Sequence, residues 1–329
     1  MALLEIRDLV CEFPTEDGVV RATRNVDLSV EPGEIVGLVG ESGSGKSVLL
    51  RTIMRMLRPP GRVVSGTIHY DGRDMSALSE RELRRMRGGE IALIPQDPVN
   101  SLNPSLSIGY QVTRALRLHR GEAPAEGWRA EAVRILREVG VSVEGGKLRQ
   151  HPFNFSQGQV QRIMTAVAVL AGRPRLLLAD EPTTSLDATV EAQILWLIRS
   201  LQRETHTAII FVTHDLGVIA QLADRVAVMY AGSIVEHGPV RELFANPLHP
   251  YTIGLLLSSR GFTDREAGSG RLYAMPGAPP DLTSLGPGCP FAPRCEWADE
   301  RCRTQTPPLR PFRAGVAACH HLERIHGAT

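Results

Sequence analysis

The pattern of hydrophobic positions predicts short buried strands that alternate with helices. Residues 3–13 alternate apolar and polar side chains, as a strand does, and residues 108–171 follow a mostly helical pattern. Uninterrupted apolar runs, typical of strands buried on both faces, occur at residues 35–39, 91–94, 176–179 and 208–212. Strands of this kind separated by helices favour an α/β fold in which helices cover both faces of a mostly parallel sheet.

Two further features concern the second half of the chain. Residues 226–229 and 233–235 flank Ala231 and Gly232, which predicts a β-hairpin. After residue 259, glycine and proline become frequent and the helical periodicity fades. We therefore expect one large domain over residues 1–259 and a small C-terminal extension over residues 260–329.

Composition narrows the class of protein. The formal net charge is +1, which gives no reason to expect nucleic acid as a partner. No apolar run reaches the about 18 residues of a membrane span, and the N-terminus lacks the basic and apolar segments of a secretory signal. We expect a cytosolic chain whose contact with a membrane, if any, comes through a partner.

A glycine-rich loop follows the apolar run at residues 35–39 and precedes a predicted helix at residues 46–57. Its sequence fits G-x-x-x-x-G-K-[ST], in which glycines let backbone N–H groups face phosphates at the N-terminus of a helix. Lys46 would supply charge to the β- and γ-phosphates, and the Ser47 hydroxyl is suited to ligate magnesium. An ordinary glycine-rich turn is the alternative, but the flanking strand and helix favour nucleotide binding. The predicted nucleotide-binding residues of the loop are Gly40, Glu41, Ser42, Gly43, Ser44, Gly45, Lys46, Ser47 and Val48.

Two carboxylates, Asp180 and Glu181, follow the apolar run at residues 176–179. Open α/β sheets bind their ligands at the carboxyl ends of the strands. Asp180 is suited to the magnesium shell, and Glu181, which points the other way by strand alternation, can polarise an attacking water. A strand that simply ends at the surface is the alternative, and the glycine-rich loop upstream favours the catalytic interpretation.

Between the loop and the acidic pair lies the sequence Phe155-Ser156-Gln157-Gly158-Gln159. It resembles the signature of the ABC (ATP-binding cassette) ATPases, usually Leu-Ser-Gly-Gly-Gln, and departs from it at Phe155 and Gln157. The resemblance implies that two cassettes close head to tail, so that Ser156, Gln157, Gly158 and Gln159 cap the ATP held by the partner. From these five residues alone, a polar helix N-cap is the alternative.

Four other positions resemble ABC motifs in the expected order. Gln96 resembles the Q-loop glutamine, Asp187 lies in a stretch at residues 184–187 that resembles the D-loop, and His214 resembles the switch histidine. Phe13 is placed to stack on adenine, with a core phenylalanine as the alternative. The resemblance implies a P-loop NTPase (RecA-like) nucleotide-binding domain with a helical subdomain at about residues 97–172. It implies catalytic roles for Glu181, His214 and Lys46, and magnesium ligation by Ser47, Gln96 and Asp180.

Three longer stretches, at residues 96–104, 246–252 and 286–295, resemble the ATPases of oligopeptide/dipeptide importers. This resemblance implies an ATPase that powers peptide import from the cytoplasmic face of the membrane. The implied partners are two transmembrane permease subunits, a second ABC ATPase subunit and an extracytoplasmic solute-binding protein. Import of another solute, such as nickel or an oligosaccharide, is an alternative. A second alternative is a soluble ABC ATPase acting on nucleic acid or ribosomes. The single glycine-rich loop and the near-zero net charge disfavour it.

Four of the five cysteines lie within the C-terminal extension. Their spacing lacks the short C-x2–4-C unit of most zinc sites, whereas a [4Fe–4S] cluster tolerates loose spacing. Members of the resembled family carry such a cluster at the matching cysteines. Zinc, with His320 or His321 as a further ligand, and free thiols are the alternatives, and Cys11 is expected to be a buried strand residue. The expected cluster ligands are Cys289, Cys295, Cys302 and Cys319.

Overall fold

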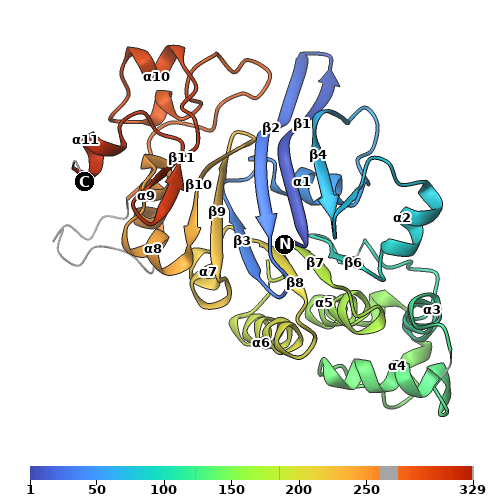
Figure 1. The fold of residues 1–329 in the computed structure, drawn as a ribbon. Coiled ribbons are helices and arrows are strands. Elements are labelled where there is room, and N and C mark those ends of the chain that lie inside the picture. Colours follow the sequence, from blue (N-terminus) through green and yellow to red (C-terminus); the bar gives the residue numbers. More distant parts are fainter. Residues whose placement is uncertain (99, 123, 185, 260–272, 328–329) are drawn as a thin grey trace. The chain divides into compact units, whose positions relative to one another are not determined.

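Figure 1 shows a computed structural model of the chain as a ribbon coloured from the N-terminus to the C-terminus. The structure describes all residues except 99, 123, 185, 260–272 and 328–329. The fold divides into two units, each assembled from segments that are distant in the sequence. The first unit comprises Met1, Val30–Glu34 and Ala77–Phe211, and the second comprises Ala2–Ser29, Ile35–Ser76 and Val212–Thr329.

The N-terminal part of the second unit forms a sheet with the strand order β2-β1-β4-β5, of which Figure 1 labels β2, β1 and β4. Strand β4 runs antiparallel to both β1 and β5. In β1, Leu4 and Ile6 are buried whereas Arg7 is exposed, so the strand predicted from alternating residues is confirmed. Cys11 of β1 is fully buried, as expected. The strands are β1 (Leu4–Thr15), β2 (Gly18–Val30), β4 (Arg62–Tyr70) and β5 (Arg73–Asp74).

A second set of strands in the same unit has the order β11-β12-β10-β9-β3. Strand β3 runs parallel to β9, and the other neighbours are antiparallel. Ala231 and Gly232, at φ 46 and 84, form the tight turn between β9 and β10, so the predicted hairpin is confirmed. Strands β11 and β12 come from the predicted C-terminal extension. The strands are β3 (Ile35–Val39), β9 (Arg225–Tyr230), β10 (Ser233–Pro239), β11 (Arg310–Phe312) and β12 (Gly315–Ala317).

The helices of the second unit cover these strands, with α7 against β3 and α8 against β9 and β10. In the C-terminal region, Leu248, Phe312, Ala317 and Leu322 form a small buried cluster, and Cys319 packs against it. This cluster gives the glycine- and proline-rich region a modest apolar core of its own. The helices are α1 (Lys46–Ile53), α7 (Leu216–Leu222), α8 (Val240–Ala245), α9 (Pro250–Ser258), η6 (Ala292–Arg294), α10 (Glu300–Thr304) and α11 (Leu322–His326).

The first unit contains strands β6, β7 and β8, with β7 between the other two and parallel to β6. Every residue of β7 and β8 is buried, as their continuous apolar sequences predict. The helical pattern predicted after residue 108 is confirmed: α3 packs on α4 and η3, and α5 packs on α6. The elements are β6 (Ile91–Ile94), β7 (Leu176–Asp180), β8 (Ala208–Val212), α2 (Glu80–Met86), α3 (Ile108–Arg120), α4 (Gly127–Glu138), η1 (Lys147–Arg149), η2 (Pro152–Asn154), α5 (Gln157–Thr165), η3 (Ala166–Ala171) and α6 (Ala188–Thr205).

Two expectations need correction. The prediction of a mostly parallel sheet holds only for part of the strands. The pairs β3–β9 and β6–β7 are parallel, but β1, β4 and β5 form a separate antiparallel sheet, and β10, β11 and β12 pair antiparallel too. The helix after the glycine-rich loop ends at Ile53 rather than at residue 57. Arg55 takes a left-handed conformation, φ 49, and Pro59 and Pro60 follow, so the helix cannot continue.

Among the residues that the structure describes, no helix combines the length and the apolar character needed to cross a membrane.

Candidate nucleotide site and cysteine cluster

The glycine-rich loop joins β3 to α1 in the second unit. Gly40, Gly43 and Gly45 all have positive φ, at 155, 80 and 103. A Cβ on Gly40 would lie 2.1 Å from the carbonyl oxygen of Met229, and one on Gly45 would lie 2.1 Å from that of Ala22. Glycine is therefore required at both positions, and it lets the loop curl so that its N–H groups can face an anion.

Lys46 opens helix α1 and is buried, with 6% of its surface exposed. Its ammonium group donates to the carbonyl oxygens of Gly40 and Glu41, at 2.7 and 2.9 Å, and to Oγ of Ser44 at 3.2 Å. The side chain thus folds back over its own loop. A positive charge at this place adds to the dipole of the helix N-terminus and creates a site for phosphate.

Glu41 is held by residues from far along the chain. Its backbone N–H donates to the hydroxyl of Tyr251 at 2.8 Å. Its carboxylate accepts two hydrogen bonds from the guanidinium of Arg294, at 2.8 and 3.0 Å. These roles of Tyr251 and Arg294 were not predicted: both residues lie in stretches that resemble importer ATPases, but no spacing rule links them to residue 41.

The acidic pair lies in the first unit, where β7 ends. Asp180 is the last residue of the strand and is 3% exposed, and Glu181 is partly buried. Glu181 takes a left-handed conformation, φ 47, which is uncommon for a residue other than glycine. Its carboxylate accepts a hydrogen bond from Oγ1 of Thr184 at 2.9 Å, so its position is fixed by its own turn.

Residues 156–159 begin helix α5, also in the first unit. Oγ of Ser156 accepts from the N–H of Gln159, and Oε1 of Gln159 accepts from the N–H of Ser156, so the two form a capping box. The N-cap alternative is thus realised in the structure, and it fixes the helix start. Gln157 is exposed, and the nearest described atoms to a Cβ on Gly158 would belong to Val190 and Leu186, at ordinary contact distances of 3.4 to 3.9 Å.

Helix α5 is also tied to the loop that carries Glu181. Nε2 of Gln161, a buried side chain, donates to the carbonyl oxygen of Pro182 at 2.6 Å. The predicted D-loop begins helix α6, because the carboxylate of Asp187 accepts from the N–H groups of Thr189 and Val190 at 3.1 and 3.0 Å. Ser185 of this stretch lies outside the described residues.

Three predicted residues lie on strands or just after them. Gln96 is exposed after β6 in the first unit, and His214 is exposed after β8. Phe13 on β1 is half-buried, and its ring covers Gly61 so closely that a Cβ there would lie 2.4 Å from it. The predicted residues are thus divided between the units. Phe13, the glycine-rich loop and His214 belong to the second unit, and Gln96, Asp180, Glu181, Asp187 and residues 156–159 belong to the first.

The four predicted cluster cysteines come together in the second unit. Burial, together with the neighbouring thiols Cys319, Cys295 and Cys302, raises the pKa of Cys289 to about 12. Backbone N–H groups two residues further along point at three of the sulfurs: Phe291 at Cys289, Trp297 at Cys295 and His321 at Cys319. Gathered sulfurs that accept N–H hydrogen bonds are a suitable donor set for an iron–sulfur cluster or for zinc.

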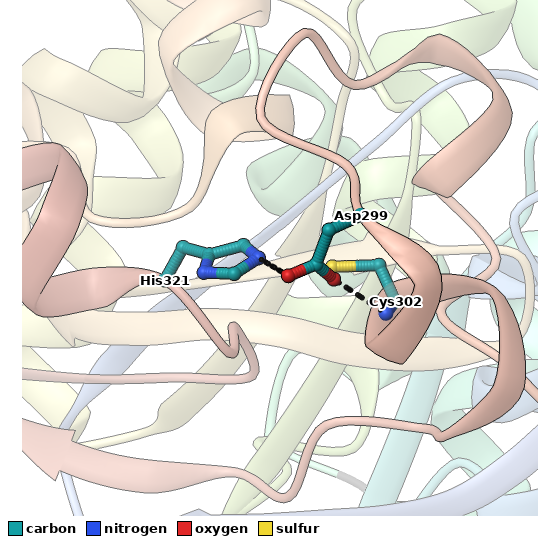
Figure 2. Close-up of side chains that lie close together, drawn as sticks. All are labelled: Asp299, Cys302 and His321. Carbon is teal, nitrogen blue, oxygen red and sulfur yellow. Dashed lines mark hydrogen bonds and ion pairs between the residues drawn. The ribbon is translucent and has the colours of Figure 1, made fainter.

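Figure 2 shows a second possible ligand group at the same place, formed by Asp299, Cys302 and His321. Their ligand atoms all lie within 4.8 Å of one another. Nε2 of His321 lies 3.0 Å from Oδ2 of Asp299, and the N–H of Cys302 donates to Oδ1 of Asp299 at 3.0 Å. His320 points elsewhere, since its Nε2 lies 3.0 Å from the carbonyl oxygen of Gln305. Of the two histidines considered as zinc ligands, His321 is therefore the one beside the cysteines.

This arrangement defines a P-loop nucleotide-binding protein: a buried strand leads into a glycine-rich loop, and the helix that follows begins with a lysine folded over the loop. The profile of the ABC transporter family matches residues 23–184, and that of the oligopeptide/dipeptide transporter C-terminal region matches residues 235–302. The chain is 47% identical over 308 residues to the oligopeptide transport ATP-binding protein OppD of Bacillus subtilis, which covers 93% of this chain and 85% of the relative. It is 45% identical over 318 residues to OppD of Salmonella typhimurium, covering 96% and 93% of the two chains. The chain belongs to the family of ABC transporter ATP-binding proteins that includes these oligopeptide transport subunits.

Solved structures agree with this assignment. The dimeric ATP-binding cassette MJ0796, bound to ADP and phosphate after hydrolysis, is 27% identical with a TM-score of 0.65, over 72% of this chain and 99% of its own. CbiO1 of Clostridium perfringens, part of the ABC transporter complex cbiONQ, is 27% identical with a TM-score of 0.60, over 74% and 91% of the two chains. The resemblance first noted at residues 155–159 is therefore confirmed at the level of the family and the fold.

Proposed function

We propose that this chain hydrolyses ATP to power the import of peptides through a membrane ABC transporter. The observation that carries the proposal is the P-loop with Lys46 folded over it, in a chain that matches oligopeptide transport ATP-binding proteins over more than nine-tenths of its length. A second ATPase subunit, two permease subunits and an extracytoplasmic solute-binding protein complete the transporter. The chain binds the permeases at the cytoplasmic face of the membrane.

In the proposed mechanism, ATP lies on the glycine-rich loop. Lys46 contacts the β- and γ-phosphates, and Phe13 stacks on adenine. Ser47, Asp180 and Gln96 would hold magnesium, which would neutralise part of the charge on the phosphates. Glu181 orients a water for in-line attack on the γ-phosphate, and His214 contacts that phosphate. The left-handed turn at Glu181 and its hydrogen bond to Thr184 support this role, because they fix the carboxylate before the reaction begins.

Residues 156–159 act on the ATP of the partner subunit. The capping box orders the start of α5 and leaves the first helical N–H groups of Gln157 and Gly158 without a helix partner. None of the described residues demands glycine at position 158, since a Cβ there meets them only at ordinary contact distances. A close approach by the partner's phosphates accounts for the glycine, and the exposed Gln157 lies at the rim of that contact.

Peptide uptake by cells tests this function. A strain that lacks the gene should fail to accumulate a labelled tripeptide, and the wild-type chain should restore uptake. The Glu181→Gln chain should not restore it, whereas Glu204→Gln, which alters an exposed carboxylate on helix α6, should. Uptake at the wild-type rate in the deleted strain, or its restoration by Glu181→Gln, would count against the proposal.

We also propose that Cys289, Cys295, Cys302 and Cys319 hold a [4Fe–4S] cluster. The gathered sulfurs and the N–H groups that point at them support it. Bound there, the cluster would cross-link the C-terminal region and add the stability that its small apolar core lacks. Zinc on Asp299, Cys302 and His321 is the competing occupant.

Anaerobic purification followed by iron, sulfide and zinc analysis separates the two occupants. A cluster predicts about four irons and four sulfides per chain. Cys289→Ser should abolish them and His321→Asn should leave them in place, because His321 belongs to the zinc group alone. Stoichiometric zinc that His321→Asn removes and Cys289→Ser retains would show that the cluster proposal is wrong.

A further inference from the structure

A buried arginine of the C-terminal region contacts the phosphate loop. The side chain of Arg294 is 5% exposed, and its two terminal nitrogens lie 2.8 and 3.0 Å from the two carboxylate oxygens of Glu41. Paired parallel hydrogen bonds of this kind are among the strongest between charged side chains. The two residues are 253 positions apart in the sequence, and both belong to the second unit.

Arg294 is fixed from every side. Its Nε donates to the carbonyl oxygen of Pro276 at 2.9 Å, and Nη1 lies 3.4 Å from the hydroxyl of Tyr230. The guanidinium also lies over the rings of Tyr230 and Phe291, at 5.8 and 5.9 Å from their centres. The side chain therefore has little freedom to follow Glu41 if the loop moves.

Glu41 is fixed as firmly on its own side. Its N–H is bound to Tyr251, and its carbonyl oxygen accepts from the Lys46 ammonium at 2.9 Å and from the N–H of Ser44 at 3.2 Å. Glu41 is thus one of the residues that hold the ammonium group of Lys46, together with Gly40 and Ser44. In that sense Arg294 acts on the phosphate site through Glu41.

The pair also has an electrostatic consequence. Glu41 places a carboxylate inside the loop that must accept the negative charges of a triphosphate. Within a Debye length of about 8 Å, an uncompensated carboxylate would repel that ligand. Arg294 supplies the compensating charge at direct contact and from a buried position where salt screens little.

We infer that Arg294 is a positioning residue for ATP binding, which neutralises Glu41 and so keeps the phosphate loop receptive to the nucleotide. The inference rests on nucleotide binding by the loop and is independent of which metal the cysteines hold. The rival explanation is that Arg294 only fastens the C-terminal region to the rest of the second unit. That explanation gives the charge of Glu41 no part in nucleotide affinity.

Titration of the full-length chain with magnesium and a non-hydrolysable ATP analogue distinguishes the two explanations. Arg294→Met should weaken binding about tenfold, the order expected when a carboxylate in the phosphate loop loses its compensating charge and repels the ligand. Arg294→Met combined with Glu41→Gln should bind within about threefold of wild type, because the repelling carboxylate is gone. Arg310→Met is the matched control, since it breaks an exposed pair with Glu323 within the C-terminal region and should not change affinity.

Two outcomes would overturn the inference. If the double variant binds as weakly as Arg294→Met, the loss comes from a loosened C-terminal region and not from charge. If Arg294→Met itself binds within about twofold of wild type, Arg294 has no part in ATP binding. If Arg294→Met fails to fold, Arg294→Lys provides the test, because lysine keeps the charge without the paired geometry. The affinity of Arg294→Lys for the analogue should stay within about threefold of wild type. A tenfold loss of affinity would refute the inference.

Discussion

Replacing Gly158 by alanine should make the chain more stable and much less active. A Cβ at this position would lie 3.4 and 3.7 Å from the two methyl groups of Val190 and 3.9 Å from Leu186, which are ordinary contacts. Gly158 is the second residue of α5, and alanine is favoured over glycine in a helix by about 0.5–1 kcal/mol. For a chain of this size, such a gain raises the melting temperature by about 2 °C.

ATP turnover should move in the opposite direction. The proposed dimer brings the partner's phosphates against the backbone at position 158, and a methyl group there displaces the N–H donors of the signature. Because one misplaced anion-binding donor costs about 10²-fold in catalysis, turnover should fall at least about tenfold. Steady-state phosphate release and thermal melting of the same preparations measure both effects.

Gly109→Ala is the matched comparison on helix α3. There a Cβ would lie 2.7 Å from the carbonyl oxygen of Leu148, so this variant should lose stability, not gain it. Wild-type turnover by Gly158→Ala would refute the reasoning, because it would mean that nothing outside the chain requires glycine at the signature. A loss of stability in that variant would refute the steric part.

Two further perturbations test other parts of the structure. Burial lowers the pKa of His249 from 6.5 to about 3, so its neutral form contributes stability that is fully present above pH 6.5 and is lost as the pH falls toward 3. In His249→Asn the amide oxygen can still accept from the N–H of Tyr251. Thermal melting should therefore show a smaller loss of stability between about pH 8 and pH 4 for His249→Asn than for wild type. Equal acid losses in the two proteins would contradict this assignment. Cys319→Ser removes one ligand of the proposed cluster, so it should lower the iron content and make the C-terminal region sensitive to limited proteolysis, whereas Cys11→Ala, on strand β1, should change neither. A resistant C-terminal region in Cys319→Ser would show that no metal stabilises it.

The sequence predicted the local elements well and their assembly less well. The bounds of β3, β6 and β8 match the apolar runs residue for residue, because glycine, proline and polar residues interrupt each run sharply. The separate antiparallel sheet was missed, although the one-sided alternation in β1 is typical of such sheets. The short strands β11 and β12 were missed as well, since three residues are too few to show a period.

The candidate site shows the same limit. Local spacing was enough to find the glycine-rich loop and the acidic pair, because their chemistry depends on adjacent residues. No local sequence pattern indicates the left-handed turn at Glu181, and none indicates the hydrogen bonds that Tyr251 and Arg294 make with Glu41. These contacts depend on how distant segments pack, which the order of residues along the chain does not reveal.

ATP turnover by purified Glu181→Gln, with Glu204→Gln as the control, tests most directly whether this chain is an ATPase in which Glu181 orients the attacking water. Glu181→Gln should bind magnesium ATP as wild type does but hydrolyse it at least about 10²-fold more slowly, because the water loses the group that orients it. Glu204→Gln should hydrolyse ATP at the wild-type rate. Near-normal hydrolysis by Glu181→Gln would show that Glu181 does not have this role.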